Sequence, residues 1–148
     1  MDGNQIVIRV FHLLGATIAL GGGIYTFIVM RRVIPLVPES DRDHVREALR
    51  KRWAGLFMLS ITLLLLTGLY TYMVYKVPQH KGDGRYHGVM GAKILLAMAI
   101  FFIGSALAGR SPAFAKMRAN AGFWQIVNIT LGFVVIMLAG IAHAMPIK

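Results

Sequence analysis

The chain alternates between four long apolar stretches and three polar connections. Each stretch holds more than twenty residues, and at about 1.5 Å of rise per residue a helix of that length crosses the roughly 30 Å hydrocarbon layer of a bilayer. The pattern predicts an all-α fold, an integral membrane four-helix bundle that forms one domain over residues 1–148. The predicted spans cover residues 8–30, 53–76, 87–108 and 123–145.

The polar connections differ in charge. Connection 31–52 holds seven Lys or Arg and connection 109–122 holds three, whereas the other side has five: Arg9, Lys76, Lys81, Arg85 and Lys148. Because basic residues favour the cytoplasmic side of a membrane, both basic connections are expected in the cytoplasm and both termini outside. Ser40 and Asp43 have capping-box spacing and predict a short cytoplasmic amphipathic helix before the second span.

Composition narrows the function classes. With 57% hydrophobic and 15% charged residues, the chain is expected to be a multi-pass protein of the inner (plasma) membrane. The net charge of +10 follows the expected topology, so nucleic acid is not an expected partner. The absence of Cys excludes disulfides, zinc–thiolate sites, iron–sulfur clusters and haem attached through Cys.

Histidines near the outer ends of three spans are the main candidate ligands. His12 and His143 each share a helical face with small residues, and His12, His87 and His143 fall at one predicted depth. Imidazoles on inward faces are the usual way in which a helical bundle holds haem or a transition metal. We favour His12 with His87 as the axial pair, with His143 as the substitute second ligand. The alternative is that His12 lies in the headgroup layer or serves only packing.

Lys93 and several methionines extend this set. Lys93 lies about a turn and a half inside the third span, where it either pairs with a haem propionate or anionic substrate or extends outward to the interface. Met90 would join His12, His87 and His143 in a metal site, since thioether and imidazole together suit Cu(I). Methionines of an apolar chain are equally expected as packing residues.

Two further patterns bear on the architecture and the chemistry. The separations of His12 from His87 and of Trp53 from Trp124 are similar, which suggests two related helix hairpins with the first and third helices diagonal in the bundle. The spans contain no Asp or Glu, so a carboxylate proton relay is not expected.

Short motifs in the spans carry a family resemblance: His12-Leu-Leu-Gly with Gly21-Gly-Gly, Arg31-Arg followed by Pro35, Leu66-Thr-Gly-Leu-Tyr70, and Lys93-Ile-Leu-Leu. They resemble the copper-resistance D (CopD) domain superfamily, which is similar to the four-helix, haem-binding protoporphyrinogen oxidases of bacteria. In the oxidase family a His early in the first helix and a Lys in the third are functional, which corresponds to His12 and Lys93. The chain lacks that family's Trp before the glycines, so the resemblance implies a haem-b or copper protein rather than a named reaction.

One main hypothesis and two alternatives result. The main hypothesis is a haem-b-binding membrane redox protein, active in electron transfer or as a haem-dependent oxidoreductase, with its site near the outer membrane face. Its expected partners are the lipid bilayer and a quinone or redox partner protein, and it would act as a homo-oligomer or within a larger membrane complex. The alternatives are a copper-binding or copper-transport protein and a small accessory subunit of a larger complex.

Overall fold

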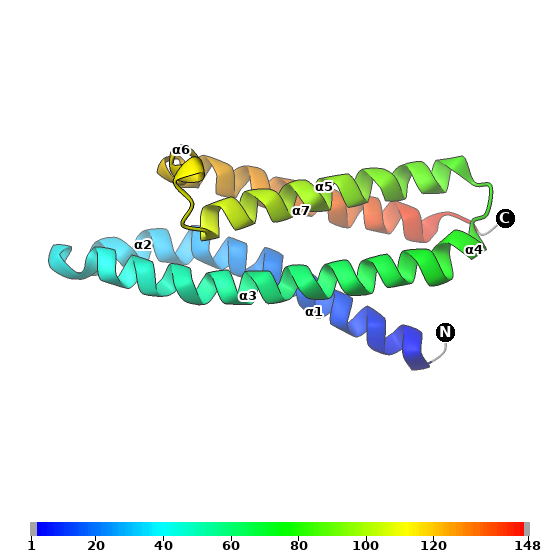
Figure 1. The fold of residues 1–148 in the computed structure, drawn as a ribbon, viewed down its shortest axis with the longest axis horizontal. Helices are drawn as coiled ribbons and strands as arrows, with labels where there is room; N and C mark the ends of the chain where they lie inside the picture. The colour runs from blue at the N-terminus through cyan, green and yellow to red at the C-terminus, as the bar shows by residue number, and fades with distance from the viewer. Residues whose placement is uncertain (1–2, 147–148) are drawn as a thin grey trace.

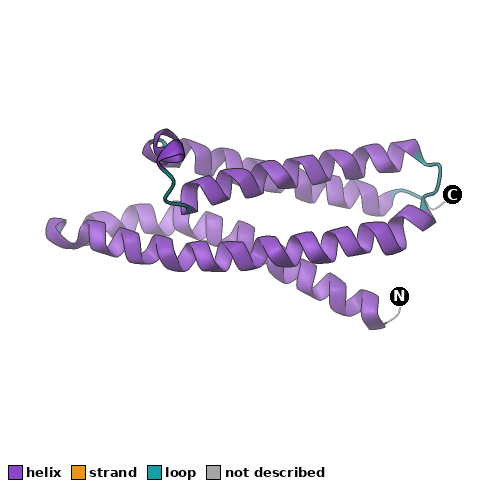
Figure 2. Ribbon diagram, viewed as in Figure 1, coloured by secondary structure: helices purple, strands orange, loops and turns teal. Residues whose placement is uncertain are grey.

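The computed structural model describes residues 3–146, and this part of the chain is helical almost throughout and contains no strand (Figures 1 and 2). Four long helices form the body of the protein: α1 (Gly3–Tyr25), α3 (Arg42–Tyr70), α5 (Gly84–Ala108) and α7 (Ala121–Ala144). Short helices lie in the connections: α2 (Arg31–Val33), α4 (Val77–Gln79) and α6 (Ala115–Ala119). π-Helical segments extend α1 over Thr26–Met30 and α3 over Thr71–Lys76, and 3₁₀ turns cover Ile34–Leu36, Glu39–Asp41 and Pro112–Phe114.

Four helical runs are long and apolar enough to cross a membrane: Gly3–Leu36, Glu39–Gln79, Gly84–Ala108 and Ala121–Ala144. The shortest has 24 residues. At about 1.5 Å per residue, even this run exceeds the roughly 30 Å of a hydrocarbon layer. The prediction of an all-helical chain with four helices that can span a membrane is confirmed.

The long helices form two antiparallel hairpins that pack against each other. α1 pairs with α3 and α5 pairs with α7, while less extensive contacts join α3 to α5 and α1 to α7. α1 and α5 therefore face each other diagonally, as the two similar separations in the sequence suggested. Figure 1 shows α2 and α6 at one end of the bundle and α4, the start of α1 and the end of α7 at the other. The two basic connections thus share one end.

The second helix differs from the prediction. The short amphipathic helix expected before the second span is not separate, because α3 runs unbroken from Arg42 into the apolar stretch and no proline interrupts it. The Ser40 hydroxyl donates to the Asp41 carboxylate over 3.3 Å, and no side chain caps the start of α3. The charged turns are therefore a rigid extension of the second span.

The third helix begins three residues earlier than predicted. The Asp83 carboxylate accepts hydrogen bonds from the backbone N–H groups of Arg85 and Tyr86, at 3.1 and 3.2 Å, and so caps α5 at Gly84. A side chain that accepts in this way satisfies amide groups that the first helical turn leaves unpaired. His87 consequently lies inside α5 rather than at its first residue.

Glycines let aromatic side chains of α3 reach the neighbouring helices. Phe57 is only 2% exposed and packs directly on Gly104 of α5, and Trp53 packs on Gly22 of α1. A Cβ atom added at either glycine would overlap the ring. Small residues at helix contacts allow this close approach.

The outer surfaces of the long helices are apolar and exposed. Leu66, Leu95 and Met137 are 67%, 68% and 64% exposed. A soluble monomer rarely leaves so much apolar surface in water. Contact with the lipid bilayer explains this surface.

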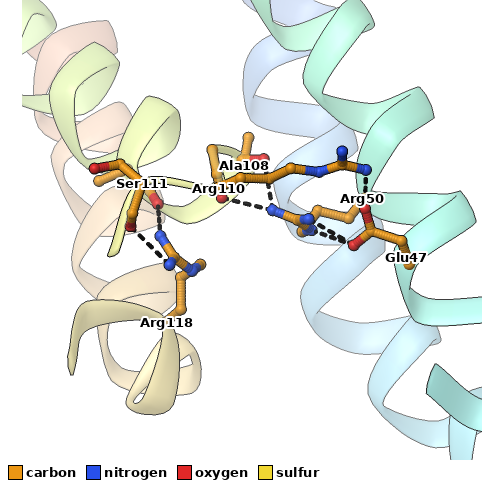
Figure 3. Close-up of polar contacts among 8 residues, drawn as sticks. Glu47, Arg50, Ala108, Arg110, Ser111 and Arg118 are labelled. Atoms are coloured by element: carbon orange, nitrogen blue, oxygen red, sulfur yellow. Dashed lines mark hydrogen bonds and ion pairs between the residues drawn. The ribbon is translucent and has the colours of Figure 1, made fainter. Parts of the chain in front are cut away.

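A charged cluster joins the two hairpins at the basic end (Figure 3). Glu47 of α3 is hydrogen-bonded to Arg50 at 2.5 Å and paired with Arg110 from the connection after α5. Arg50 also donates to the Gly109 carbonyl over 2.6 Å. These contacts satisfy a carbonyl just after the last turn of α5 and connect it to α3.

Candidate cofactor site

His12 on α1 is hydrogen-bonded to Thr67 on α3. His12 Nδ1 lies 2.9 Å from the Thr67 hydroxyl oxygen, and that hydroxyl donates its own proton to the Leu63 carbonyl over 2.5 Å. Since the hydroxyl proton is already used, the oxygen accepts from His12, which places the imidazole proton on Nδ1. Nε2 therefore carries a lone pair, and it forms no hydrogen bond within residues 3–146.

Gly68 provides room for the His12 ring. A Cβ atom at Gly68 would lie 3.1 Å from His12 Cε1, closer than side chains normally approach. The ring is thus fixed by a hydrogen bond on one edge and by the glycine surface of α3.

Two contacts fix the register between α3 and α5. Tyr72 of α3 is hydrogen-bonded to His87 of α5 at 2.9 Å, and Phe57 of α3 packs on Gly104 of α5. In antiparallel helices, residues that lie level have position numbers with a nearly constant sum. Both contacts give a sum of about 160. A difference of one in this sum corresponds to only about 1.5 Å along a helix, so the two contacts agree on the register.

This register brings Lys93 level with Thr67, and therefore with His12. Lys93 lies about 9 Å along α5 from His87, and Thr67 lies about 7.5 Å along α3 from Tyr72, in the same direction. Lys93 has no ion pair with a carboxylate in the described part of the chain. We name His12, Thr67, Gly68 and Lys93 the His12 layer.

Along the helix axes, the His12 layer lies well away from the ends of α1 and α5. His12 is about 14 Å along α1 from its first residue, because α1 begins at Gly3, and Lys93 is only about 5 Å from the midpoint of α5. The sequence prediction had placed His12 near the end of its span. An imidazole and an ammonium at this depth are costly in a membrane unless they are used or paired.

His87 differs from His12 because both of its ring nitrogens are hydrogen-bonded. Nε2 lies 3.0 Å from the His80 carbonyl oxygen and must donate to it, so Nδ1 accepts from the Tyr72 hydroxyl. Neither nitrogen keeps a free lone pair in this arrangement. The structure thus brings His12 level with Lys93 rather than with its predicted partner His87, whose role as a ligand remains a prediction.

The two other predicted ligands lie outside the His12 layer. His143 is exposed in the last turn of α7, where the neighbouring Ala142 is the buried residue. Met90 is 9% exposed and packs in an apolar cluster with Tyr86 and Ala142. Among residues 3–146, no group of three or more His, Asp or Glu side chains is arranged to hold a metal ion.

His80 is a buried residue in the turn before α5. It is 2% exposed and stacks on Tyr86, with ring centroids 3.6 Å apart and an interplanar angle of 4°. Its carbonyl holds His87, and its Nδ1 has no hydrogen-bond partner. Pro78 and Gly82 in the same connection are typical of a solvated loop, and in the sequence only the nearness of His80 to His87 suggests a role at the site.

Searches against protein-family models, curated proteins and solved structures found no match to this chain. The class of the protein is therefore defined by its fold, a helical bundle with four helices long and apolar enough to cross a membrane.

Proposed function

We propose that this chain is a multi-pass membrane redox protein that binds haem b non-covalently at the His12 layer, with His12 as an axial ligand. The supporting observation is the hydrogen bond between His12 Nδ1 and the Thr67 hydroxyl, which itself donates to Leu63; these contacts assign the proton to Nδ1 and leave a lone pair on Nε2. Histidines that ligate metals commonly donate their second ring N–H to a nearby oxygen, which fixes the tautomer and the ring orientation. Thr67 supplies that oxygen.

Lys93 is suited to bind the negatively charged propionate edge of haem. By the register between α3 and α5, Lys93 lies level with His12, and it has no carboxylate partner within residues 3–146. Because an unpaired ammonium is costly within a membrane, an anionic group on a bound ligand would stabilise it. Haem carries two propionates, so Lys93 would pair with one of them.

Small residues of α7 lie at the same level. The cluster that contains Met90 and Ala142 sets the register between α5 and α7, and three residues further along, Lys93 lies level with Ala139 and next to Gly140. Figure 1 shows the first half of α1 leaning away from α5 and α7, and its apolar side chains are about half exposed. A flat apolar group could approach His12 from this side.

The residues would divide the work as follows. His12 would hold the haem, Thr67 would keep the imidazole in orientation, Lys93 would neutralise a propionate, and the apolar faces of the helices would keep water from the site. Haem b, when bound, supplies a reversible one-electron centre. The charge asymmetry of ten against five basic residues supports a site nearer the outer face of the plasma membrane, in reach of a quinone or redox partner protein.

Copper binding has less support from the contacts. Met90 is packed among apolar side chains and both nitrogens of His87 are engaged, so these residues do not form an open thioether–imidazole site. The copper alternative therefore stays a prediction from the sequence.

Titration of the detergent-purified protein with haem tests the proposal. We expect a reducible Soret band that saturates at about one haem per chain, as for a single axial His site. Lys93→Met should weaken haem binding, whereas His143→Ala, the matched control on the exposed side of α7, should leave it unchanged. Bound copper without haem would support the copper alternative, and absence of both would support the accessory subunit.

A further inference from the structure

An open pocket lies at the basic end of the bundle, away from the His12 layer. Its volume is about 320 Å³, and it lies between the end of the first helical run and the first turns of α3. The residues that line it are Thr26, Met30, Arg31, Ile34, Pro35 and Arg46. Two arginines thus line a pocket whose other walls are mostly apolar.

The Arg31 guanidinium is held in position without an acidic partner. Its Cζ atom lies 5.1 Å from the centre of the Phe27 ring. The same group packs against α7 at Gly122, where an added Cβ atom would come within 3.4 Å of Nη1. Arg31 has no ion pair within residues 3–146. Its charge is therefore oriented but not neutralised by the described part of the protein.

Most other arginines at this end already have structural partners. Arg42 donates to two carbonyls of the turn before it, at 2.9 and 2.8 Å. Arg50 and Arg118 donate to carbonyls at and after the end of α5 (Figure 3). Arg46 reaches the exposed Asp43 carboxylate only at 3.4 Å, and its side chain is 60% exposed. The pocket consequently keeps a net positive charge.

We propose that this pocket binds the phosphate headgroup of an anionic phospholipid from the leaflet on the basic side of the bundle. Guanidinium groups bind phosphate oxygens through paired hydrogen bonds, and basic pockets between membrane helices are suited to lipid headgroups. Arg31 directly follows the apolar stretch of the first span, which is the depth of the headgroup layer.

Apolar residues on the hydrocarbon side of the pocket favour a lipid over a free anion. Met30 lines the pocket, and Tyr25 and Ile28, which precede Arg31 by one to two turns, are 55% and 50% exposed. Acyl chains of a lipid whose phosphate is held by Arg31 and Arg46 would extend along this surface, whereas free phosphate would leave it bare.

Native mass spectrometry of the detergent-purified protein, incubated with phosphatidylglycerol or phosphatidylcholine, tests this assignment. The wild type should retain phosphatidylglycerol in preference to phosphatidylcholine. Arg31→Gln and Arg46→Gln should each lower that retention about fivefold, the effect of one basic residue near an anionic headgroup. Arg32→Gln is the matched control, because Arg32 is adjacent and exposed but does not line the pocket.

Two results would overturn the proposal. The first is an equal loss of phosphatidylglycerol in Arg32→Gln and Arg31→Gln, which would show that overall charge, not the pocket, retains the lipid. The second is displacement of the lipid by millimolar inorganic phosphate, which would make the site one for a free anion. If Arg31→Gln does not fold, as judged by circular dichroism, Arg46→Gln decides alone, because its side chain is exposed.

Discussion

Gly104→Ala tests the register between α3 and α5, on which the His12 layer depends. The new methyl group would overlap the ring of Phe57, which is only 2% exposed and so has little room to move. Overpacking of this kind costs about 1–3 kcal/mol. We therefore expect the variant to fold with reduced stability.

The matched control is Gly91→Ala in the same helix. No heavy atom lies within 4 Å of a Cβ atom at Gly91, so the change introduces no overlap. Both substitutions gain about 1 kcal/mol of helix propensity, and this gain cancels when the two variants are compared. Gly104→Ala should thus be less stable than Gly91→Ala by about 1–3 kcal/mol.

Unfolding by sodium dodecyl sulfate in mixed micelles, followed by tryptophan fluorescence, measures the difference. Trp53 is a local reporter, because its ring centroid lies 5.7 Å from that of Phe57. Phe57→Leu should recover stability in the Gly104→Ala background, since the smaller side chain makes room for the methyl group. Equal stabilities of the two alanine variants, or no recovery by Phe57→Leu, would refute the register.

Three other changes test separate parts of the structure. Thr67→Val removes the oxygen that orients the proposed axial imidazole and should weaken haem binding about 10- to 100-fold in a titration; unchanged affinity would contradict that orientation. Arg50→Gln removes the donor to the carbonyl after α5 and should lower unfolding stability by about 1–3 kcal/mol, and a wild-type unfolding midpoint would contradict its role. In this Cys-free chain, Ser40→Cys and Ser111→Cys should be labelled only from the cytoplasm and Gln79→Cys only from outside. Labelling of Ser40→Cys from outside in intact cells would invert the orientation.

Long apolar runs made the four helices and their hairpin order predictable. Such runs exceed the bilayer thickness, and short polar connections leave antiparallel neighbours as the simplest arrangement. The helix ends were less predictable. α5 begins at Gly84 because of a cap by Asp83, and the charged turns continue into α3 because nothing there breaks a helix.

The candidate site could be predicted only in part. His12 stood out because an ionisable residue among small ones needs a reason in an apolar span. The association of His12 with Lys93 depends on the register between α3 and α5, which Phe57 and Gly104 set through a contact that no local pattern reveals. The positions and hydrogen bonds of His143 and His87 also depend on local details that the sequence pattern does not reveal. At the end of α7, a rotation of one residue buries Ala142 instead of His143, and the turn before α5 supplies the carbonyl that engages His87.

The most direct test of the central claim is the haem spectrum of His12→Gly with and without added imidazole. Removal of the axial ligand should abolish the reducible Soret band of the wild type, and imidazole, which fits the vacated space beside Thr67 and Gly68, should restore it. His44→Gly, in the exposed charged turns of α3, is the control and should keep the wild-type spectrum. A full haem spectrum in His12→Gly without imidazole would contradict the assignment of His12 as the axial ligand.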